Sequence, residues 1–179
     1  IGALANCAGT PAPAAPQFFI KPNTTVVGPG DPVTLPEYSE AVSVEGELAV
    51  IIGRIAKSVT LERVHEVVFG YTVANDLTAR DVMETDTQWT RAKSFDGSTP
   101  LGPWIETELD TDSLNITSWA DGDVVQEGNT SDMHYSVAEL VSAASEIFTL
   151  LPGAIILTGT PAGTSVLRDG PAVQVEAGG

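Results

Sequence analysis

One stretch of the chain combines a strand pattern with charges that the interior of a strand rarely holds. Residues 42–53 read VSVEGELAVIIG, and their valine and isoleucine content favours a β-strand. Because strand side chains alternate between two faces, Glu45 and Glu47 share a face with Ala49 and Ile51. Two buried carboxylates repel each other, and burying their charge is costly unless a cation neutralises it. Either this end of the strand is exposed to water, or a cation binds there.

Length and charge limit the classes of protein to which the chain can belong. Its 179 residues are 42% hydrophobic, enough for a sizeable core, and we expect a single domain over residues 1–179. The 24 acidic and 8 basic residues give a formal net charge of -16, which would repel nucleic acid. No apolar run approaches the roughly 20 residues of a membrane helix. We therefore expect neither a nucleic-acid nor a membrane partner.

The cysteine content bears on the compartment. Cys7 is the only cysteine of the sequence, which excludes an intrachain disulfide and a cysteine-cluster metal site. The N-terminus also lacks the basic region followed by an apolar run that marks a secretory signal. We therefore expect a soluble protein of the reducing cytoplasm.

Hydrophobic patterns predict more strands than helices. Strands are expected at residues 17–21, 33–35, 42–52 and 71–76, and ADGD at residues 120–123 is typical of a hairpin turn. The strongest helix pattern covers residues 136–148, because its first residues, SVAE, make a capping box before apolar positions at helical spacing. A shorter helix is expected at residues 60–70. The predicted fold class is therefore α+β and rich in strands.

Asp76 adds a third carboxylate to the two on the first strand. It ends the apolar run YTVAND, and three carboxylates at strand ends suit a hard cation. Oxygen-only ligation favours Mg²⁺, Mn²⁺ or Ca²⁺ over Zn²⁺. Spacing alone is a weak signal, since an E-x-E pair more often lies on a solvated edge and a terminal aspartate more often caps a helix. On this ground both interpretations stay open.

Five motifs in a fixed order give a more specific signal. EGELAVIIGR, GYTVANDLTARDV, QWTRAKSFD, PLGPWIETEL and LLPGAIILTGTPAG follow one another within roughly residues 17–163. Together they resemble the fumarylacetoacetate hydrolase family. The resemblance implies the mixed β-sandwich-like roll of that family's C-terminal domain, with a few short helices. It also implies Mg²⁺ or Mn²⁺, with Ca²⁺ as an alternative, held by Glu45, Glu47 and Asp76.

The same resemblance implies roles for further side chains. Lys93 of RAKSFD would place an ammonium beside the enolate that forms from a metal-chelated 2-oxo acid. Arg80 of TARD has the fork geometry that binds a carboxylate, although a salt bridge with a nearby acid explains it nearly as well. Thr160 of TGTP would contact the substrate or be a simple loop residue. Lys93 and Arg80 are thus the expected catalytic residues, and both would bind substrate with Thr160. Lys21 of FIKP lies in a family-like stretch without a clear role.

Two departures from the family pattern bear on function. Met83 stands where many relatives have a glutamine seven residues after the metal aspartate. Residues 1–16 begin like the family's mobile lid, but IGALAN runs directly into CAGTPAPAAP without the His and Glu that activate water. Either lid residues are missing between Asn6 and Cys7, or the lid is truly truncated.

The resemblance implies an enzyme that acts on 2-oxo or β-diketo acids in the catabolism of small or aromatic-derived acids. Its reaction would be C–C bond hydrolysis of acylpyruvate or fumarylpyruvate type, or isomerisation of 2-hydroxy-dienedioates, through a metal-bound enolate. Alternatives are an oxaloacetate-type decarboxylase on the same site, and a non-catalytic, metal-stabilised binding protein if the lid pair is absent. A homodimer is also implied, and GPWIETEL, residues 102–109, would contribute to its interface or to the core.

Overall fold

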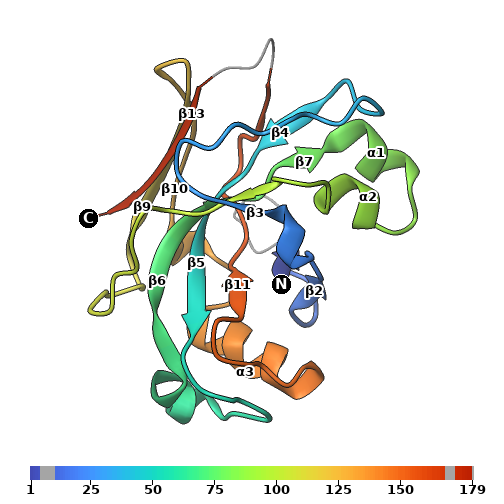
Figure 1. Ribbon diagram of the computed structural model, residues 1–179. Helices are drawn as coiled ribbons and strands as arrows, with labels where there is room; N and C mark the ends of the chain where they lie inside the picture. Colours follow the sequence, from blue (N-terminus) through green and yellow to red (C-terminus); the bar gives the residue numbers. More distant parts are fainter. Residues whose placement is uncertain (5–10, 168–171, 179) are drawn as a thin grey trace.

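The largest sheet of the molecule has five strands. The computed structural model describes residues 1–4, 11–167 and 172–178 (Figure 1). In this part of the chain the sheet order is β2-β1-β11-β5-β6, with β1 and β11 parallel and the other neighbours antiparallel. The strands are β1 Gly2–Leu4, β2 Gln17–Phe19, β5 Gly46–Ile52, β6 Val68–Asn75 and β11 Ile155–Leu157. The prediction of a strand-rich α+β fold is confirmed.

Smaller sheets extend this framework. Within the described residues their orders are β10-β9-β13, β12-β4-β7 and the parallel pair β3-β8. The strands are β3 Val26–Val27, β4 Val42–Val44, β7 Thr78–Ala79, β8 Thr99–Pro100, β9 Asn115–Ala120, β10 Asp123–Asn129, β12 Ser165–Val166 and β13 Val173–Gly178. β9 and β10 form the hairpin expected at ADGD, with Asp121 and Gly122 at the positive φ of a type I′ turn. Glu45 alone separates β4 from β5, so the predicted strand at residues 42–52 passes from one sheet into another.

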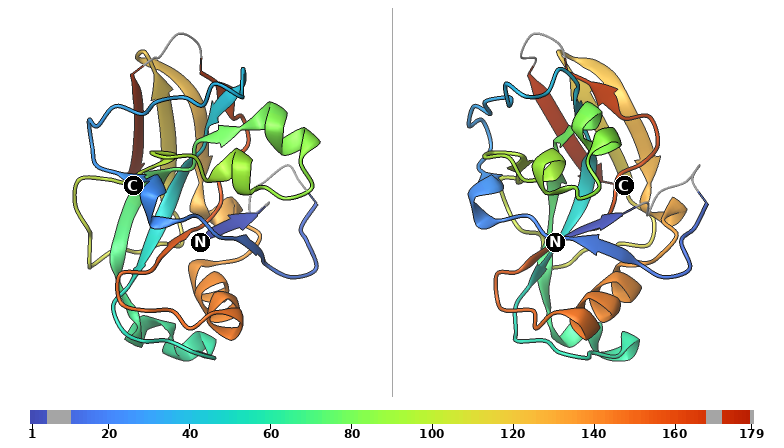
Figure 2. Two further views of the ribbon diagram at one scale, coloured as in Figure 1. Left: turned by 45° about the vertical axis from the view of Figure 1, so that its right-hand side comes forward. Right: turned by 90° about the vertical axis from the view of Figure 1, so that its right-hand side faces the viewer.

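The helices lie outside the sheets. They are α1 Arg80–Thr85, α2 Thr90–Lys93 and α3 Val137–Ile147, with 3-10 segments η1 Asn23–Thr25, η2 Leu61–Glu66 and η3 Thr130–Asp132. Figure 2 shows α1 and α2 on one side of the strands and α3 below them. The predicted capping box of α3 is present: Ser136 Oγ accepts from the Glu139 N–H, and the Glu139 carboxylate accepts from the Ser136 N–H.

β5 is buried on both faces and separates two environments. One face, with Leu48 and Val50, belongs to the main hydrophobic core together with residues of α3, β9 and β13. The other face carries Glu45 and Glu47, which are 4% and 2% exposed, followed by the buried Ala49. The alternation predicted from the sequence is therefore correct, and this end of the strand is not exposed to water.

Two local predictions are wrong. The helix expected at residues 60–70 is only the 3-10 segment η2, because the β-branched Val68 already pairs with β5 as the first residue of β6. Residues 33–35 form no strand. Pro32 and Pro36 flank them, and neither offers the backbone N–H that a strand ladder needs.

The expected lid at residues 1–16 lies partly outside the described residues, which do not include Asn6 and Cys7. What is described is β1, which pairs with β2 and with β11. In the described chain, no helix has the length and apolar character needed to cross a bilayer.

Replacing Ser136 by alanine should lower the free energy of unfolding by about 1 kcal/mol, because the first turn of α3 loses the oxygen that accepts from the Glu139 N–H. Urea titration followed by circular dichroism measures this loss. Glu139→Gln is the matched control: its amide oxygen can still accept from the Ser136 N–H, so its loss should be smaller. Unchanged stability of Ser136→Ala would contradict the role of the cap.

Candidate functional site

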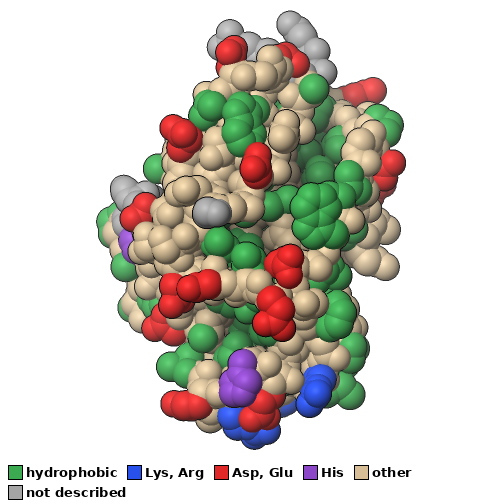
Figure 3. Space-filling view, turned by 90° about the vertical axis from the view of Figure 1, so that its left-hand side faces the viewer, with side chains coloured by type: hydrophobic (Ala, Val, Ile, Leu, Met, Phe, Trp, Pro, Cys, Tyr) green, Lys and Arg blue, Asp and Glu red, His purple; other side chains and the backbone are tan. Residues whose placement is uncertain are grey.

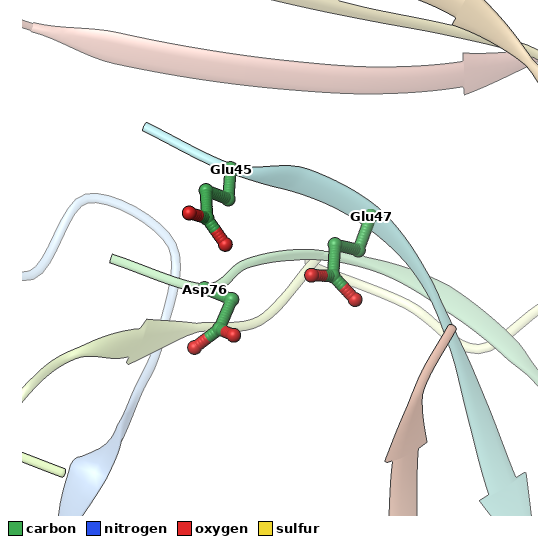
Figure 4. Close-up of side chains that lie close together, drawn as sticks. All are labelled: Glu45, Glu47 and Asp76. Carbon is green, nitrogen blue, oxygen red and sulfur yellow. The ribbon is translucent and has the colours of Figure 1, made fainter. Parts of the chain in front are cut away.

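Three carboxylates meet where β4, β5 and β6 come together (Figure 4). Glu45 lies between β4 and β5, Glu47 lies in β5, and Asp76 directly follows β6. One oxygen from each side chain lies within 4.8 Å of the others. A hydrogen bond of 2.8 Å from the Asp76 N–H to the Glu45 carbonyl joins the two strand segments. The structure thus brings together the three carboxylates that the sequence singled out.

Glu47 carries the least compensated of these charges. Its carboxylate accepts a hydrogen bond of 2.6 Å from the Gly159 N–H, and no ion pair of the described residues includes it. Burial and the nearby Asp76 carboxylate raise the pKa of Glu47 well above its ordinary value, although Lys93 opposes this shift. A cation beside Glu47 would remove this penalty, so the donor set fits a metal ion.

Two buried lysines contact the cluster. Lys93 Nζ lies 2.5 Å from Glu45 Oε2 and 2.8 Å from Asp76 Oδ2. Burial lowers the pKa of Lys93, but the carboxylates of Asp76 and Glu45 outweigh burial and the net shift is upward, so the ammonium stays charged. Lys21 Nζ lies 2.6 Å from Asp76 Oδ1 and also donates to the Lys93 carbonyl. Lys21 therefore secures both the aspartate and the backbone of the second lysine.

The two lysines compensate the carboxylates unequally. Burial disfavours the charge of Asp76, but the ammonium groups of Lys93 and Lys21 hold the pKa of Asp76 below its ordinary value. The pKa of Glu45 remains raised by burial despite Lys93. Among the described residues Lys21, Lys93 and Arg80 pair with Asp76 and Glu45, and Glu47 has no cationic partner. The position beside Glu47, with hard oxygen donors around it, suits a divalent cation.

Arg80 and Thr160 lie at the edge of this cluster. Arg80 Nη1 is 3.4 Å from Glu45 Oε1 and Nη2 is 3.2 Å from Thr164 Oγ1, with the side chain 37% exposed. Arg80 thus forms a salt bridge with an acid, as one of the two interpretations expected, and that acid is Glu45. Part of the Arg80 side chain remains accessible to solvent. Thr160 Oγ1 donates to the Gly46 carbonyl at 3.0 Å, so its hydrogen is already used inside the protein.

Sequence reasoning missed several groups of the site. It gave no role to Lys21, for which FIKP was the one available signal. It did not find the Gly159 N–H that binds Glu47, nor Gln126 of β10, which donates to Thr160 at 2.7 Å. Met83 is partly buried against the apolar cluster around Val82 and offers the site no polar contact.

The chain is similar in sequence and in fold to known proteins. Residues 3–179 match the family model of the fumarylacetoacetate (FAA) hydrolase C-terminal domain. The crystal structure of 5-carboxymethyl-2-hydroxymuconate delta-isomerase from Mycobacterium smegmatis is similar with a TM-score of 0.94 and 42% sequence identity. That match covers 98% of this chain and 72% of the isomerase chain.

Two curated relatives are longer than this chain. Protein Rv2993c of Mycobacterium tuberculosis is 45% identical over 175 residues, which cover 96% of this chain and 66% of the relative. The mitochondrial oxaloacetate tautomerase fahd2 of Xenopus laevis is 41% identical over 173 residues, which cover 94% of this chain and 54% of the relative. The chain therefore spans between about half and two thirds of the length of these relatives.

In metal-free protein, the stability that Glu47 contributes should fall as pH rises. Its raised pKa means that the folded state binds the proton more tightly than the unfolded chain does. The stabilisation from Glu47 is therefore fully present below the ordinary glutamate pKa of about 4.3, and it is lost as pH rises through the higher pKa of the folded state. Urea titrations with a chelator, from about pH 5 upward, should show the native chain losing stability relative to Glu47→Gln.

Asp76→Asn supplies the control of opposite sign. Because the pKa of Asp76 is lowered, its contribution is present above the ordinary aspartate pKa and is lost as pH falls through the folded-state pKa. A stability difference between the native chain and Glu47→Gln that does not change with pH would contradict the prediction.

Proposed function

Because the chain belongs to the fumarylacetoacetate hydrolase family, we propose that it is a divalent-metal-dependent enzyme that isomerises 2-oxo acids through an enolate. One observation carries the proposal: three buried carboxylates form one cluster, and a charged lysine contacts two of them. The metal ligands would be Glu45, Glu47 and Asp76. The ion would be Mg²⁺ or Mn²⁺, with Ca²⁺ as the alternative, because the donors are all carboxylate oxygens.

The residues around the carboxylates supply binding and charge stabilisation. When bound, the ion would act as a Lewis acid toward the carboxylate and keto oxygens of the substrate. Lys93 holds its ammonium beside that position, where it would stabilise the negative charge that develops as a proton leaves the carbon next to the keto group. The exposed part of Arg80 would bind a substrate carboxylate through its fork of donors. Thr160 keeps an oxygen lone pair for a donor of the substrate.

The substrate class that fits best is a 2-oxo acid with a second carboxylate. By their names, the Mycobacterium smegmatis relative isomerises a carboxymethyl-hydroxymuconate and the Xenopus laevis relative tautomerises oxaloacetate. Both reactions move a proton in an acid that carries oxygen at carbon 2. They favour isomerisation over C–C bond hydrolysis of acylpyruvate or fumarylpyruvate and over oxaloacetate decarboxylation. Such substrates would place the enzyme in the catabolism of small or aromatic-derived acids.

A metal-stabilised protein without turnover is the second candidate. The sequence favours it at one point, since IGALAN continues into CAGTPAPAAP without the His and Glu of the family's lid. The carboxylate cluster would then serve binding and stability alone.

A substrate screen separates these functions. Purified protein is tested with oxaloacetate, 5-carboxymethyl-2-hydroxymuconate and acylpyruvates, in Mn²⁺ and in chelator. Isomerisation should accelerate the decay of enol absorbance and exchange the carbon-3 proton in deuterated water, in Mn²⁺ but not in chelator. Cleavage of acylpyruvates into two acids would favour hydrolysis instead. Metal binding without turnover of any compound would favour the binding protein.

The chain should bind one Mn²⁺ through the carboxylate cluster, and Asp76→Ala should abolish both this binding and metal-dependent activity. The variant loses one ligand and leaves the ammonium groups of Lys21 and Lys93 without the carboxylate that they share. Titration calorimetry measures the affinity. Asp123→Ala, which removes an exposed carboxylate of β10, is the control and should bind as the native chain does. Unchanged affinity in Asp76→Ala would refute the ligand assignment.

Lys93→Met should reduce kcat by roughly 10²-fold, the scale of losing one well-placed electrostatic donor, while KM changes less. The extra negative charge develops only in the transition state, so the ammonium contributes most there. Metal affinity should persist or increase, because a competing positive charge leaves Glu45 and Asp76. Lys57→Met is the control, since among the described residues that exposed ammonium donates to the backbone carbonyls of residues 146 and 147, away from the carboxylates. A near-normal kcat of Lys93→Met would contradict the role.

We propose further that the enzyme is a homodimer. Trp104 and Ile105 are 71% and 44% exposed, so packing within the chain leaves most of Trp104 and part of Ile105 uncovered. Trp104 borders a groove of about 1000 Å³ between residues 28–35, β6 and β13. Figure 3 shows this side of the molecule, with hydrophobic side chains exposed between acidic ones. An exposed apolar patch of this kind supports a protein interface.

Light scattering at micromolar concentration should give twice the 18.6 kDa mass of one chain. Trp104→Ser should shift the protein toward the monomer, because it removes the largest exposed apolar side chain at the groove. Ile55→Ser, which replaces an apolar side chain that is 70% exposed in the turn after β5, should leave the dimer intact. A monomeric native chain would contradict the proposal.

A further inference from the structure

We propose that Gln126 is a positioning residue of the carboxylate cluster, which it holds in its ligand geometry from a neighbouring sheet. The inference rests on the proposed function, since it concerns the same carboxylates. Gln126 lies on β10, in a different sheet from β5 and β6, and is 3% exposed. Its side chain reaches the backbone between Glu45 and Glu47.

The side-chain amide of Gln126 makes four hydrogen bonds, two as acceptor and two as donor. Oε1 accepts from the Gly46 N–H at 2.9 Å and from Ser118 Oγ at 3.1 Å. Nε2 donates to Thr160 Oγ1 and to the Pro161 carbonyl, both at 2.7 Å. A backbone N–H can only donate and a backbone carbonyl can only accept, so these partners fix the orientation of the amide. The side chain therefore has one defined hydrogen-bonding role.

Gln126 holds the backbone that carries the glutamates, directly and through Thr160. Gly46 is the residue between Glu45 and Glu47, and its N–H binds Gln126 directly. Its carbonyl accepts from Thr160 Oγ1 at 3.0 Å, and that hydroxyl in turn accepts from Gln126. The peptide groups on both sides of Gly46 are thus held by one amide and its partner.

The two hydrogen bonds that Gln126 Nε2 donates also hold the loop after β11. Thr160 and Pro161 both accept from Gln126, and they follow Gly159 directly. The Gly159 N–H donates to the Glu47 carboxylate at 2.6 Å. Gln126 therefore fixes the backbone of Glu47 and also the donor that orients its carboxylate.

The packing at Gly46 explains why a side chain from another sheet can reach this backbone. A Cβ atom at Gly46 would lie 2.2 Å from Ser118 Oγ and 3.0 Å from Val175 Cγ1, so any other residue here would force these side chains of the facing sheet to move. β10 is not hydrogen-bonded to β5 as a strand neighbour. Gln126 thus makes a polar link from β10 to the segment that carries Glu45 and Glu47.

The test compares Gln126→Met with Ser145→Ala in the full chain. Methionine keeps the bulk of the side chain and removes its hydrogen bonds. Ser145 is buried in α3, where its Oγ accepts from the Val59 N–H and donates to the Ser142 carbonyl, so its loss affects stability away from the carboxylates. Mn²⁺ affinity by calorimetry, the electron paramagnetic resonance spectrum of bound Mn²⁺ and stability in urea are measured for each variant.

Gln126→Met should weaken Mn²⁺ binding at least about tenfold and alter the spectrum, as expected when a residue behind metal ligands is lost. Ser145→Ala should lower stability alone. If Gln126→Met does not fold, Thr160→Val tests the inference instead, because it removes the hydroxyl that joins Gln126 to the Gly46 carbonyl. Thr160→Ser keeps that hydroxyl and should bind Mn²⁺ with native affinity. Native affinity and spectrum in the folded variants would overturn the inference and leave the proposed function intact. A native chain that binds no Mn²⁺ would overturn both.

Discussion

The charge balance of three buried carboxylates governs the arrangement around the site. Carboxylates at 0–4% exposure are stable as ions only beside positive charge or strong hydrogen-bond donors. Lys93 comes from α2, Lys21 from the segment after β2, and the Gly159 N–H from the loop after β11. Elements far apart in the sequence must therefore meet at one point. A divalent cation would complete this balance at Glu47, since the described cations, Lys21, Lys93 and Arg80, pair with Asp76 and Glu45.

β5 is buried on both faces, and this lets the chain place the carboxylates next to a stable hydrophobic core. Leu48 and Val50 project into the main apolar cluster, while the glutamates on the opposite face stay outside it. The hydrophobic effect stabilises one face of the strand and offsets the cost of polar burial on the other. The carboxylate cluster consequently rests on a regular strand that is buried on both faces, which is where a precise constellation of side chains is best held.

Binding and chemistry are distributed differently over the site. The carboxylates and Lys93 are buried on or next to regular elements, whereas Arg80 is more than a third exposed. In the proposed function, such an arrangement would keep the metal chemistry constant and leave recognition of the second end of a substrate to groups at the edge. This division is consistent with relatives whose names specify different 2-oxo or 2-hydroxy acids.

The sequence by itself determined features that depend on neighbouring residues. Strand alternation placed Glu45 and Glu47 on one buried face, local hydrogen bonding predicted the capping box of Ser136, and turn chemistry predicted the hairpin at residues 120–123. Residues 60–70 show the limit of local patterns, because sheet pairing with β5 overrode the helical spacing.

Only the tertiary structure decided the rest of the site. Lys21 pairs with an aspartate 55 positions away, and Gln126 binds a backbone N–H 80 positions away. Neither contact has a periodic signal in the sequence, because both depend on how separate sheets pack. A local pattern records the preferences of a segment, whereas the partners of a buried polar group are set by long-range packing, which places each donor beside its acceptor.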